Sequence, residues 1–139
     1  MLVDKENIQK LIPQRPPFVM IDNLISADET GFSSNFELRD EVLLRQDQLV
    51  SESTITEHVA QTCAAGFGYL GQKEQAGEPK IGYIGAVTKL KVHQLPKLGD
   101  VLETKVAILQ NFENIHLVQG NVFVNETEIF TCQMKIVLA

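Results

Sequence analysis

The feature that most constrains the fold is a helical segment with unusually small side chains. In residues 54–70 apolar side chains recur at the spacing of one helical face, at Ile55, Val59, Cys63, Phe67 and Leu70. The same segment contains several alanines and the glycines Gly66 and Gly68, and each glycine disfavours a helix by about 1 kcal/mol relative to alanine. We expect close approach of a surrounding backbone to offset this loss, which predicts an enclosed helix.

The ends of this helix are also marked in the sequence. Thr54-Ile55-Thr56-Glu57 matches a capping box, with Thr54 as the N-cap and Glu57 at the third position. Gly71 and Gly77 are candidate stops at the other end. Upstream of the helix, residues 7–12 predict one short helical turn.

Most of the remaining chain has the composition of strands. The candidates are rich in β-branched and aromatic residues and lie between turn residues, at 18–25, 31–38, 81–92, 101–110 and 116–124. Residues 128–138 alternate most clearly, since Phe130, Cys132, Met134, Ile136 and Leu138 are apolar and the residues between most of them are polar. A period of two with one apolar face predicts an antiparallel sheet covered on one side.

One long helix with one antiparallel sheet predicts an α+β protein. The small helix further indicates that the sheet curves tightly around it, which is the hotdog fold. The length of 139 residues suits a single domain over residues 1–139.

Composition excludes several classes of function. A net charge of −6 is unfavourable for nucleic-acid binding, which needs clustered Lys and Arg. No stretch reaches the roughly 20 apolar residues of a membrane span, and residues 1–10 lack the apolar core of a signal peptide. We therefore expect a cytoplasmic protein in which Cys63 and Cys132 stay reduced. Their spacing suggests no metal site, and no cofactor is predicted.

One basic segment stands out from this acidic chain. Between Glu78 and Asp100 there is no acidic residue, whereas lysines occur at Lys80, Lys89, Lys91 and Lys97. Complementary charge would steer an acidic carrier protein toward such a segment. The alternative is an ordinary solvent-exposed strand face, because Lys89 and Lys91 are two residues apart.

Three stretches together resemble the 3-hydroxyacyl-ACP dehydratase family. Residues 11–22, Leu-Ile-Pro-Gln-Arg-Pro-Pro-Phe-Val-Met-Ile-Asp, resemble its leucine-proline-histidine-arginine-x-proline-phenylalanine segment. Residues 57–65 resemble its glutamate-x-x-alanine-glutamine helix, and residues 85–100 its third strand and following proline-glycine-aspartate turn. The resemblance implies a hotdog fold and activity on acyl thioesters in fatty-acid or polyene-type lipid biosynthesis.

Two departures separate this chain from most of that family. The family's catalytic histidine belongs to a glycine-histidine-phenylalanine-proline-glycine loop, but residues 41–51 contain no His, Pro or Gly. The histidine of the first motif is replaced by Gln14. The chain is therefore more similar to a diverged subgroup, the dehydratase-like proteins of aryl-polyene pathways.

The resemblance also assigns roles to individual residues. In the family a histidine is the base and a glutamate handles the leaving hydroxyl, so the catalytic residue here is Glu57, favoured as an anion by the helix N-terminus. Gln61 matches the family's glutamine and would hold the helix against a neighbouring chain, unless it is a surface residue. Leu90 and Val92, together with Phe67 and Met134, are candidates to line an acyl tunnel, although core packing explains them equally.

Other polar residues receive structural interpretations. Adjacent helix positions diverge by about 100°, so His58 does not share a face with Glu57 and is expected to be partly exposed. His93 and His116 are expected to be solvated sheet residues. Cys63 and Cys132 are expected to be buried thiols rather than nucleophiles. Arg15 either pairs with an acid such as Asp22 or lies on the surface.

These assignments lead to a specific hypothesis and several alternatives. A retained glutamate without its histidine predicts that the chain donates Glu57 to a heterodimer with a histidine-containing hotdog paralogue, acting on acyl-ACP or acyl-CoA. A homodimeric dehydratase with an unusual base, in a dimer or a higher oligomer, is the second interpretation. A hotdog thioesterase and a non-catalytic acyl- or carrier-binding subunit are the others.

Overall fold

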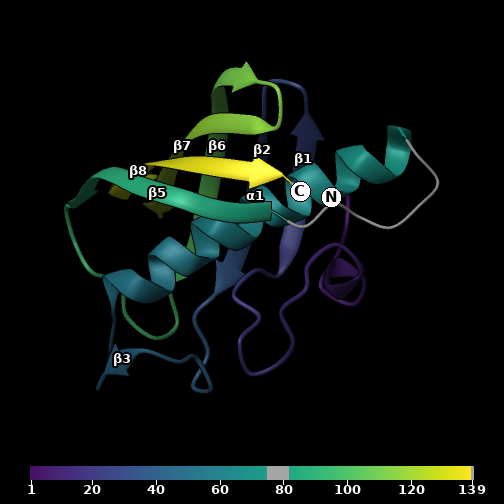
Figure 1. The fold of residues 1–139 in the computed structure, drawn as a ribbon. Helices are drawn as coiled ribbons and strands as arrows, with labels where there is room; N and C mark the ends of the chain where they lie inside the picture. The colour runs from purple at the N-terminus through teal and green to yellow at the C-terminus, as the bar shows by residue number, and fades with distance from the viewer. Residues whose placement is uncertain (75–81, 139) are drawn as a thin grey trace.

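A computed structural model describes residues 1–74 and 82–138 of the chain. Its long helix α1, Glu52–Glu74, lies against one face of a six-stranded antiparallel sheet with the order β1-β2-β6-β7-β8-β5 (Figure 1). The strands are β1 Asn23–Asp28, β2 Gly31–Glu37, β5 Gly82–Val92, β6 Val101–Phe112, β7 Ile115–Val124 and β8 Thr127–Leu138. This architecture confirms the predicted α+β hotdog fold.

Smaller elements precede α1 in the chain. The 3-10 helix η1, Ile8–Lys10, falls within the helical turn predicted at residues 7–12. The two-residue strands β3, Arg45–Gln46, and β4, Leu49–Val50, pair with each other in the segment that leads to α1. Residues 11–22 connect η1 to β1 and are called the N-terminal loop below.

The glycines allow α1 to approach its surroundings closely. A Cβ atom on Gly66 would lie 2.3 Å from the ring of Phe32, and one on Gly68 would lie 2.9 Å from the carbonyl oxygen of Leu11. Only the second of these neighbours is backbone, so the predicted backbone approach is correct at Gly68, whereas at Gly66 the neighbour is an aromatic ring. Both contacts exclude any larger side chain without rearrangement.

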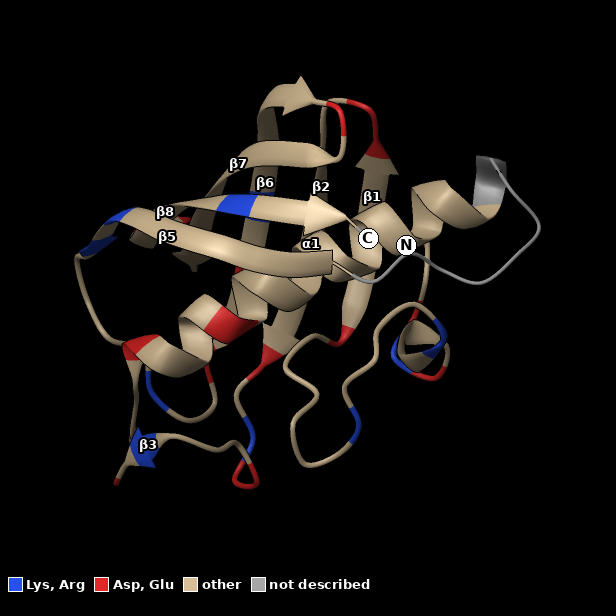
Figure 2. Cartoon of the chain, in the orientation of Figure 1, with Lys and Arg blue, Asp and Glu red and all other residues tan. Residues whose placement is uncertain are grey.

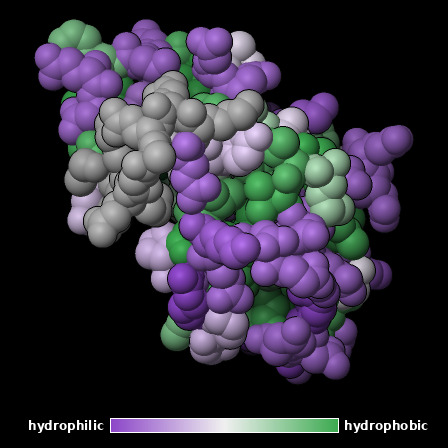
Figure 3. Space-filling view, turned by 90° about the vertical axis from the view of Figure 1, so that its right-hand side faces the viewer, coloured by the Kyte–Doolittle hydropathy of each residue, from purple (hydrophilic) through white to green (hydrophobic). Residues whose placement is uncertain are grey.

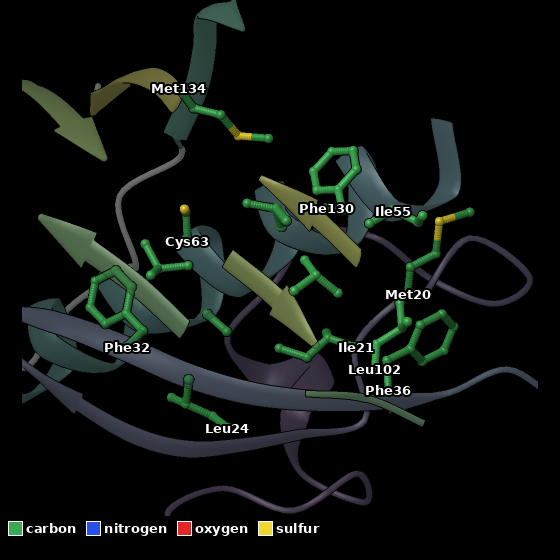
Figure 4. Close-up of a cluster of buried hydrophobic side chains, with 14 of the residues drawn as sticks. Met20, Ile21, Leu24, Phe32, Phe36, Ile55, Cys63, Leu102, Phe130 and Met134 are labelled. Carbon is green, nitrogen blue, oxygen red and sulfur yellow. The ribbon is translucent and has the colours of Figure 1, made fainter. Parts of the chain in front are cut away.

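The sheet packs its apolar face on the helix as the alternation predicted. The inward residues of β8 are Phe130, Cys132, Met134 and Ile136, and all four are buried. They meet the fully buried stripe of α1 that contains Ile55, Val59 and Cys63 (Figure 4). These side chains belong to one continuous core, so the helix and the sheet are stabilised by the same burial.

The first predicted strand is displaced. Residues 18–25 have strand composition, but β1 begins only at Asn23. Phe18 and Met20 bond instead to side chains of α1, and Phe18 N–H donates to the carbonyl of Arg15 at 2.8 Å. Buried side-chain partners have thus overridden local β propensity.

The predicted capping box is wrong. The helix begins at Glu52, and the carbonyl of Ser51 accepts from Thr54 N–H at 3.1 Å. The Thr54 hydroxyl donates to the Leu43 carbonyl at 2.7 Å, so it ties the helix to the preceding segment instead of capping it.

At the other end the helix continues through Gly71, and Gly77 lies outside the described residues. Within the described ranges no helix combines the length and apolarity needed to cross a membrane.

The two helix glycines Gly66 and Gly71 provide a matched stability test. Gly66→Ala should lower the free energy of unfolding by about 1–3 kcal/mol, because its methyl group meets the Phe32 ring. Gly71→Ala should raise it by about 0.5–1 kcal/mol, because no atom lies within 4 Å of the added Cβ and alanine favours a helix. Urea unfolding of both variants measures the difference, and equal effects would contradict the close packing at Gly66.

Candidate functional site

Glu57 lies in the wall of a cavity of about 340 Å³. One stripe of α1 contributes Glu57, Ala60, Ala64 and Phe67. The opposite walls come from η1, the N-terminal loop, and the two strand ends where β5 begins and β8 finishes. With a rise of 1.5 Å per residue, the stripe from Glu57 to Phe67 is about 15 Å long. The volume and the mainly apolar walls are typical of a site for a small organic ligand.

The carboxylate of Glu57 is held in place by the next turn of the helix. Its Oε2 accepts a hydrogen bond from Gln61 Nε2 at 2.8 Å. Glu57 is the sixth residue of α1, whereas the N–H groups left free by a helix belong to its first four residues. The prediction that Glu57 lies in the first turn is therefore wrong, and its orientation comes from Gln61 rather than from the helix end.

Gln61 joins the carboxylate to the N-terminal loop. Its Oε1 accepts from Met20 N–H at 2.6 Å, and its Nε2 donates to the Phe18 carbonyl at 2.8 Å as well as to Glu57. The side chain is fully buried. Gln61 is thus not a surface residue, and these bonds fasten α1 to the chain's own loop.

His58 is fully buried, which corrects the expectation of partial exposure. Its Nδ1 lies 2.7 Å from the Met20 carbonyl, which can only accept, so Nδ1 carries the proton. Its Nε2 therefore accepts from the Thr104 hydroxyl at 2.8 Å. Burial lowers the pKa of His58 to about 4, so the ring is neutral near pH 7. With both nitrogens engaged, this histidine is unavailable as a base.

The other histidines lie away from the Glu57 end of the cavity. His93 is exposed, with Nε2 3.7 Å from Glu128 Oε1. His116 is half-buried, its ring centroid 4.7 Å from that of Phe67, so the prediction of a solvated residue is wrong for His116. The cause is its position: His116 pairs with Ile136, whose side chain faces the helix.

The tunnel candidates fall in different surroundings. Phe67 lines the cavity and packs edge-on against Phe32 at 5.0 Å, whereas Met134 belongs to the core. Leu90 is 41% exposed, and Val92 packs on the core outside the cavity lining. The register of β5 shifts between Thr88 and Lys91. This shift breaks the alternation from which Leu90 and Val92 were predicted to line the same tunnel.

The basic segment is only partly gathered. Lys89 and Lys91 lie toward one end of β5, which carries blue in Figure 2. They line a shallow hollow of about 290 Å³ together with polar side chains of β7 and β8. Lys97 is exposed in the turn before β6 and lies outside this hollow. Lys80 falls outside the described residues.

Both cysteines are buried, and one of them lies in the cavity wall. Cys63 lines the cavity, and burial raises the pKa of its thiol. Burial also raises the pKa of Cys132 to about 11. Both thiols therefore remain protonated near pH 7 and are poor nucleophiles. In the described ranges no group of three or more His, Cys, Asp or Glu side chains is arranged to hold a metal ion.

The N-terminal loop contains a site residue that pattern reasoning did not select. Gln14 lines the cavity, and its Oε1 is buried without a hydrogen-bond partner. Arg15 Nη1 donates to the carbonyls of Ile12 and Gln14, at 2.8 and 2.7 Å, and so stiffens this turn. The suggested pair between Arg15 and Asp22 is absent from the described contacts, since Asp22 Oδ2 accepts from Arg39 at 2.7 Å. Loop residues have no period, so the replacement of a histidine by Gln14 was the only signal.

Comparison with known proteins shows similarity to dehydratases over nearly the whole chain. Residues 6–139 match a family model described as ApeP-like, ApeP dehydratase. The 3-hydroxyacyl-[acyl-carrier-protein] dehydratase FabZ of Sulfurimonas denitrificans is 25% identical, with 97% of this chain and 96% of the relative covered. FabZ of Campylobacter fetus is also 25% identical, with 96% of both chains covered.

Solved structures share the fold. A chain of the dehydratase heterocomplex ApeI:P from Xenorhabdus doucetiae superposes with a TM-score of 0.83 at 15% identity, covering 95% of this chain and 90% of that one. A hypothetical thioesterase from Streptococcus pneumoniae superposes with a TM-score of 0.68 at 10% identity, covering 84% of each chain. At these identities the likeness concerns the fold.

The burial of neutral His58 predicts a pH-dependent stability. An unfolded histidine has a pKa near 6.5, so between about pH 6.5 and 4 the unfolded chain binds a proton that the folded chain does not. The free energy of unfolding should therefore fall as the pH falls through this window, by up to about 3 kcal/mol from this residue.

Urea unfolding at several pH values measures this dependence. His58→Gln should remove most of the histidine contribution, whereas His93→Gln should retain it because His93 is exposed. An unchanged pH dependence in His58→Gln would show that the buried ring does not carry the effect.

Proposed function

Because the chain belongs to the ApeP-like dehydratase family, we propose that it is the glutamate-donating subunit of a 3-hydroxyacyl thioester dehydratase. The observation that carries this proposal is the position of Glu57, whose carboxylate is oriented by Gln61 in the wall of a largely apolar cavity. Dehydratase-like function agrees with the family and with the FabZ relatives. The base would come from a second, histidine-bearing hotdog chain.

The proposed division of labour follows from the chemistry. A base removes the proton from the carbon next to the thioester carbonyl, the bond from the third carbon to its hydroxyl oxygen breaks, and an acid protonates the departing oxygen to give water. Glu57 in its protonated form supplies the acid. His58 does not supply the base because both of its nitrogens are already hydrogen-bonded, and His93 and His116 lie outside the cavity lining.

The substrate is proposed to be an acyl-ACP or acyl-CoA of fatty-acid or polyene-type lipid biosynthesis. The names of the FabZ relatives specify an acyl-carrier-protein substrate for those proteins. Here a groove about 15 Å long leads along α1 from Glu57 to Phe67, which suits an extended acyl chain. Lys89, Lys91 and Lys97 remain the residues proposed to attract an acidic carrier.

The edge strand β5 is the surface proposed to bind the partner chain. Its backbone lies at the border of the sheet, and it exposes the apolar residues Tyr83, Ile84, Val87 and Leu90. Figure 3 shows an exposed apolar area, surrounded by hydrophilic side chains, on the side where β8 ends. A long apolar edge left uncovered would promote aggregation, so its pairing with the same strand of another hotdog chain provides a reason for its composition. The relative from Xenorhabdus doucetiae is itself part of a heterocomplex.

The catalytic proposal predicts a loss of activity on substitution of Glu57. The chain is assayed alone and together with candidate partner chains from its genomic neighbourhood, and formation of enoyl-ACP from 3-hydroxyacyl-ACP is measured. Glu57→Gln should lower kcat by about 10²-fold or more, because the acid is lost while the bond to Gln61 can be kept. Glu52→Gln, an exposed carboxylate of the same helix, should retain activity.

Each alternative function has its own outcome in this assay. Full dehydration by the lone chain would refute the subunit proposal in favour of a self-sufficient dehydratase. Release of free acid would indicate a thioesterase. Full activity of the combined chains with Glu57→Ala would indicate that this chain is a non-catalytic binding subunit.

The interface proposal predicts that a charge on β5 prevents assembly. Val87→Lys should shift the chain toward monomer and weaken binding of the partner chain, as a lysine on an edge strand opposes strand pairing. Gln133→Lys introduces the same charge on the neighbouring interior strand β8 and should leave assembly intact. Analytical ultracentrifugation measures the oligomeric state of both variants, alone and with the partner chain. Unaltered assembly in Val87→Lys would exclude β5 as the interface.

A further inference from the structure

Gln14 lines the same cavity as Glu57 and carries a buried oxygen, Oε1, without a hydrogen-bond partner. Among the described residues two buried side-chain oxygens lack a hydrogen-bond partner, Gln14 Oε1 and Ser51 Oγ, and of these only Gln14 lines the cavity. Buried polar atoms in native proteins are nearly always satisfied, so an unpaired one calls for a physical reason. A ligand that brings a donor into the cavity provides such a reason.

The backbone around Gln14 is fixed before any ligand arrives, so that only the side chain has to turn toward a ligand. Arg15 binds the carbonyl of Gln14 itself and that of Ile12, which closes the turn around this residue. Farther along the loop, Met20 is held to α1 through both its N–H and its carbonyl. An acceptor presented by a fixed backbone needs little ordering on binding, and this increases its contribution to affinity.

The acyl part of the proposed substrate contains a single hydrogen-bond donor. A thioester carbonyl oxygen can only accept, and a saturated acyl chain offers no donor. The one O–H group of a 3-hydroxyacyl chain is its 3-hydroxyl. We infer that Gln14 Oε1 accepts a hydrogen bond from this hydroxyl, and that Gln14 is therefore the residue by which the site distinguishes hydroxylated from saturated acyl thioesters. The inference rests on the proposed function.

Such a contact would also assist the reaction. When the hydroxyl donates its hydrogen to Gln14, the lone pairs of its oxygen remain available to the acid. Glu57 is held by Gln61, not by Gln14, so the two groups need not compete for the same partner. Gln14 then orients the leaving group, while Glu57 transfers the proton to it.

Binding of two ligands that differ only in the hydroxyl tests the inference. The probes are 3-hydroxydecanoyl-N-acetylcysteamine and decanoyl-N-acetylcysteamine, titrated by calorimetry into the purified chain in the oligomer that it forms. The native chain should prefer the hydroxylated probe by about fivefold to tenfold, the usual effect of one net hydrogen bond. Gln14→Met, which keeps the length of the side chain, should reduce this preference to about onefold with the affinity for decanoyl-N-acetylcysteamine retained.

Gln9 provides the matched control. It lines the same cavity and has the same amide, but its atoms are not among the buried unpaired ones, so Gln9→Met should keep the preference. Melting temperatures of both variants establish that they are folded, and Gln14→Ala takes the place of Gln14→Met if the latter unfolds.

The remaining outcomes overturn the inference in distinguishable ways. Equal affinity of the native chain for both probes, or an undiminished preference in Gln14→Met, would refute the role of Gln14 and leave the proposed function standing. An equal loss of affinity for both probes in Gln14→Met would show that Gln14 accepts a hydrogen bond from the amide that the probes share. Failure of the native chain to bind either probe would refute the inference for this chain, and the dehydration assay with the partner chain would decide the proposed function separately.

Discussion

The site depends on a polar clamp that α1 places on one residue of the N-terminal loop. Met20 N–H donates to Gln61, and the Met20 carbonyl accepts from His58, so both backbone groups of one loop residue are bound by one helix. Both side chains are fully buried, and in such surroundings a lost partner costs more than at the surface. Because Gln61 also orients Glu57, the clamp sets the carboxylate and the cavity wall in a single arrangement.

The clamp in turn requires the close packing of the helix. His58 reaches the sheet through the Thr104 hydroxyl, and Thr62 meets Ser34 at 2.7 Å, so α1 bonds to β6 and β2 through polar groups on a mainly apolar interface. Such short bonds form only if helix and sheet approach closely. The absence of a side chain on Gly66 permits this approach to the sheet, and the absence of one on Gly68 permits the approach of the N-terminal loop. The small residues that disfavour the helix locally are thus the ones that allow its polar contacts.

The sequence predicted what depends on periodic burial and missed what depends on polar contacts between distant segments. The alternation of β8 gave its inward residues correctly, and the stripe through Val59 and Cys63 gave the buried face of α1. The capping box failed because the helix begins at Glu52, two residues before Thr54, and the Thr54 hydroxyl instead binds the Leu43 carbonyl of the preceding segment. His58 was expected to be partly exposed because no periodicity reveals that a loop carbonyl and a hydroxyl from β6 would satisfy its ring nitrogens.

The same logic supports the proposal that this chain keeps the carboxylate of a dehydratase and takes its base from a second chain. The histidine beside Glu57 contributes to the structure: it is neutral, buried and bonded at both nitrogens, and freeing it for proton transfer would release the Met20 carbonyl and the Thr104 hydroxyl at the same time. The bond to Met20 helps to hold the N-terminal loop, which supplies part of the cavity wall, against α1. A base can therefore be supplied to this cavity more readily from outside the chain than from within it, and the uncovered edge of β5 is where a second hotdog chain would approach.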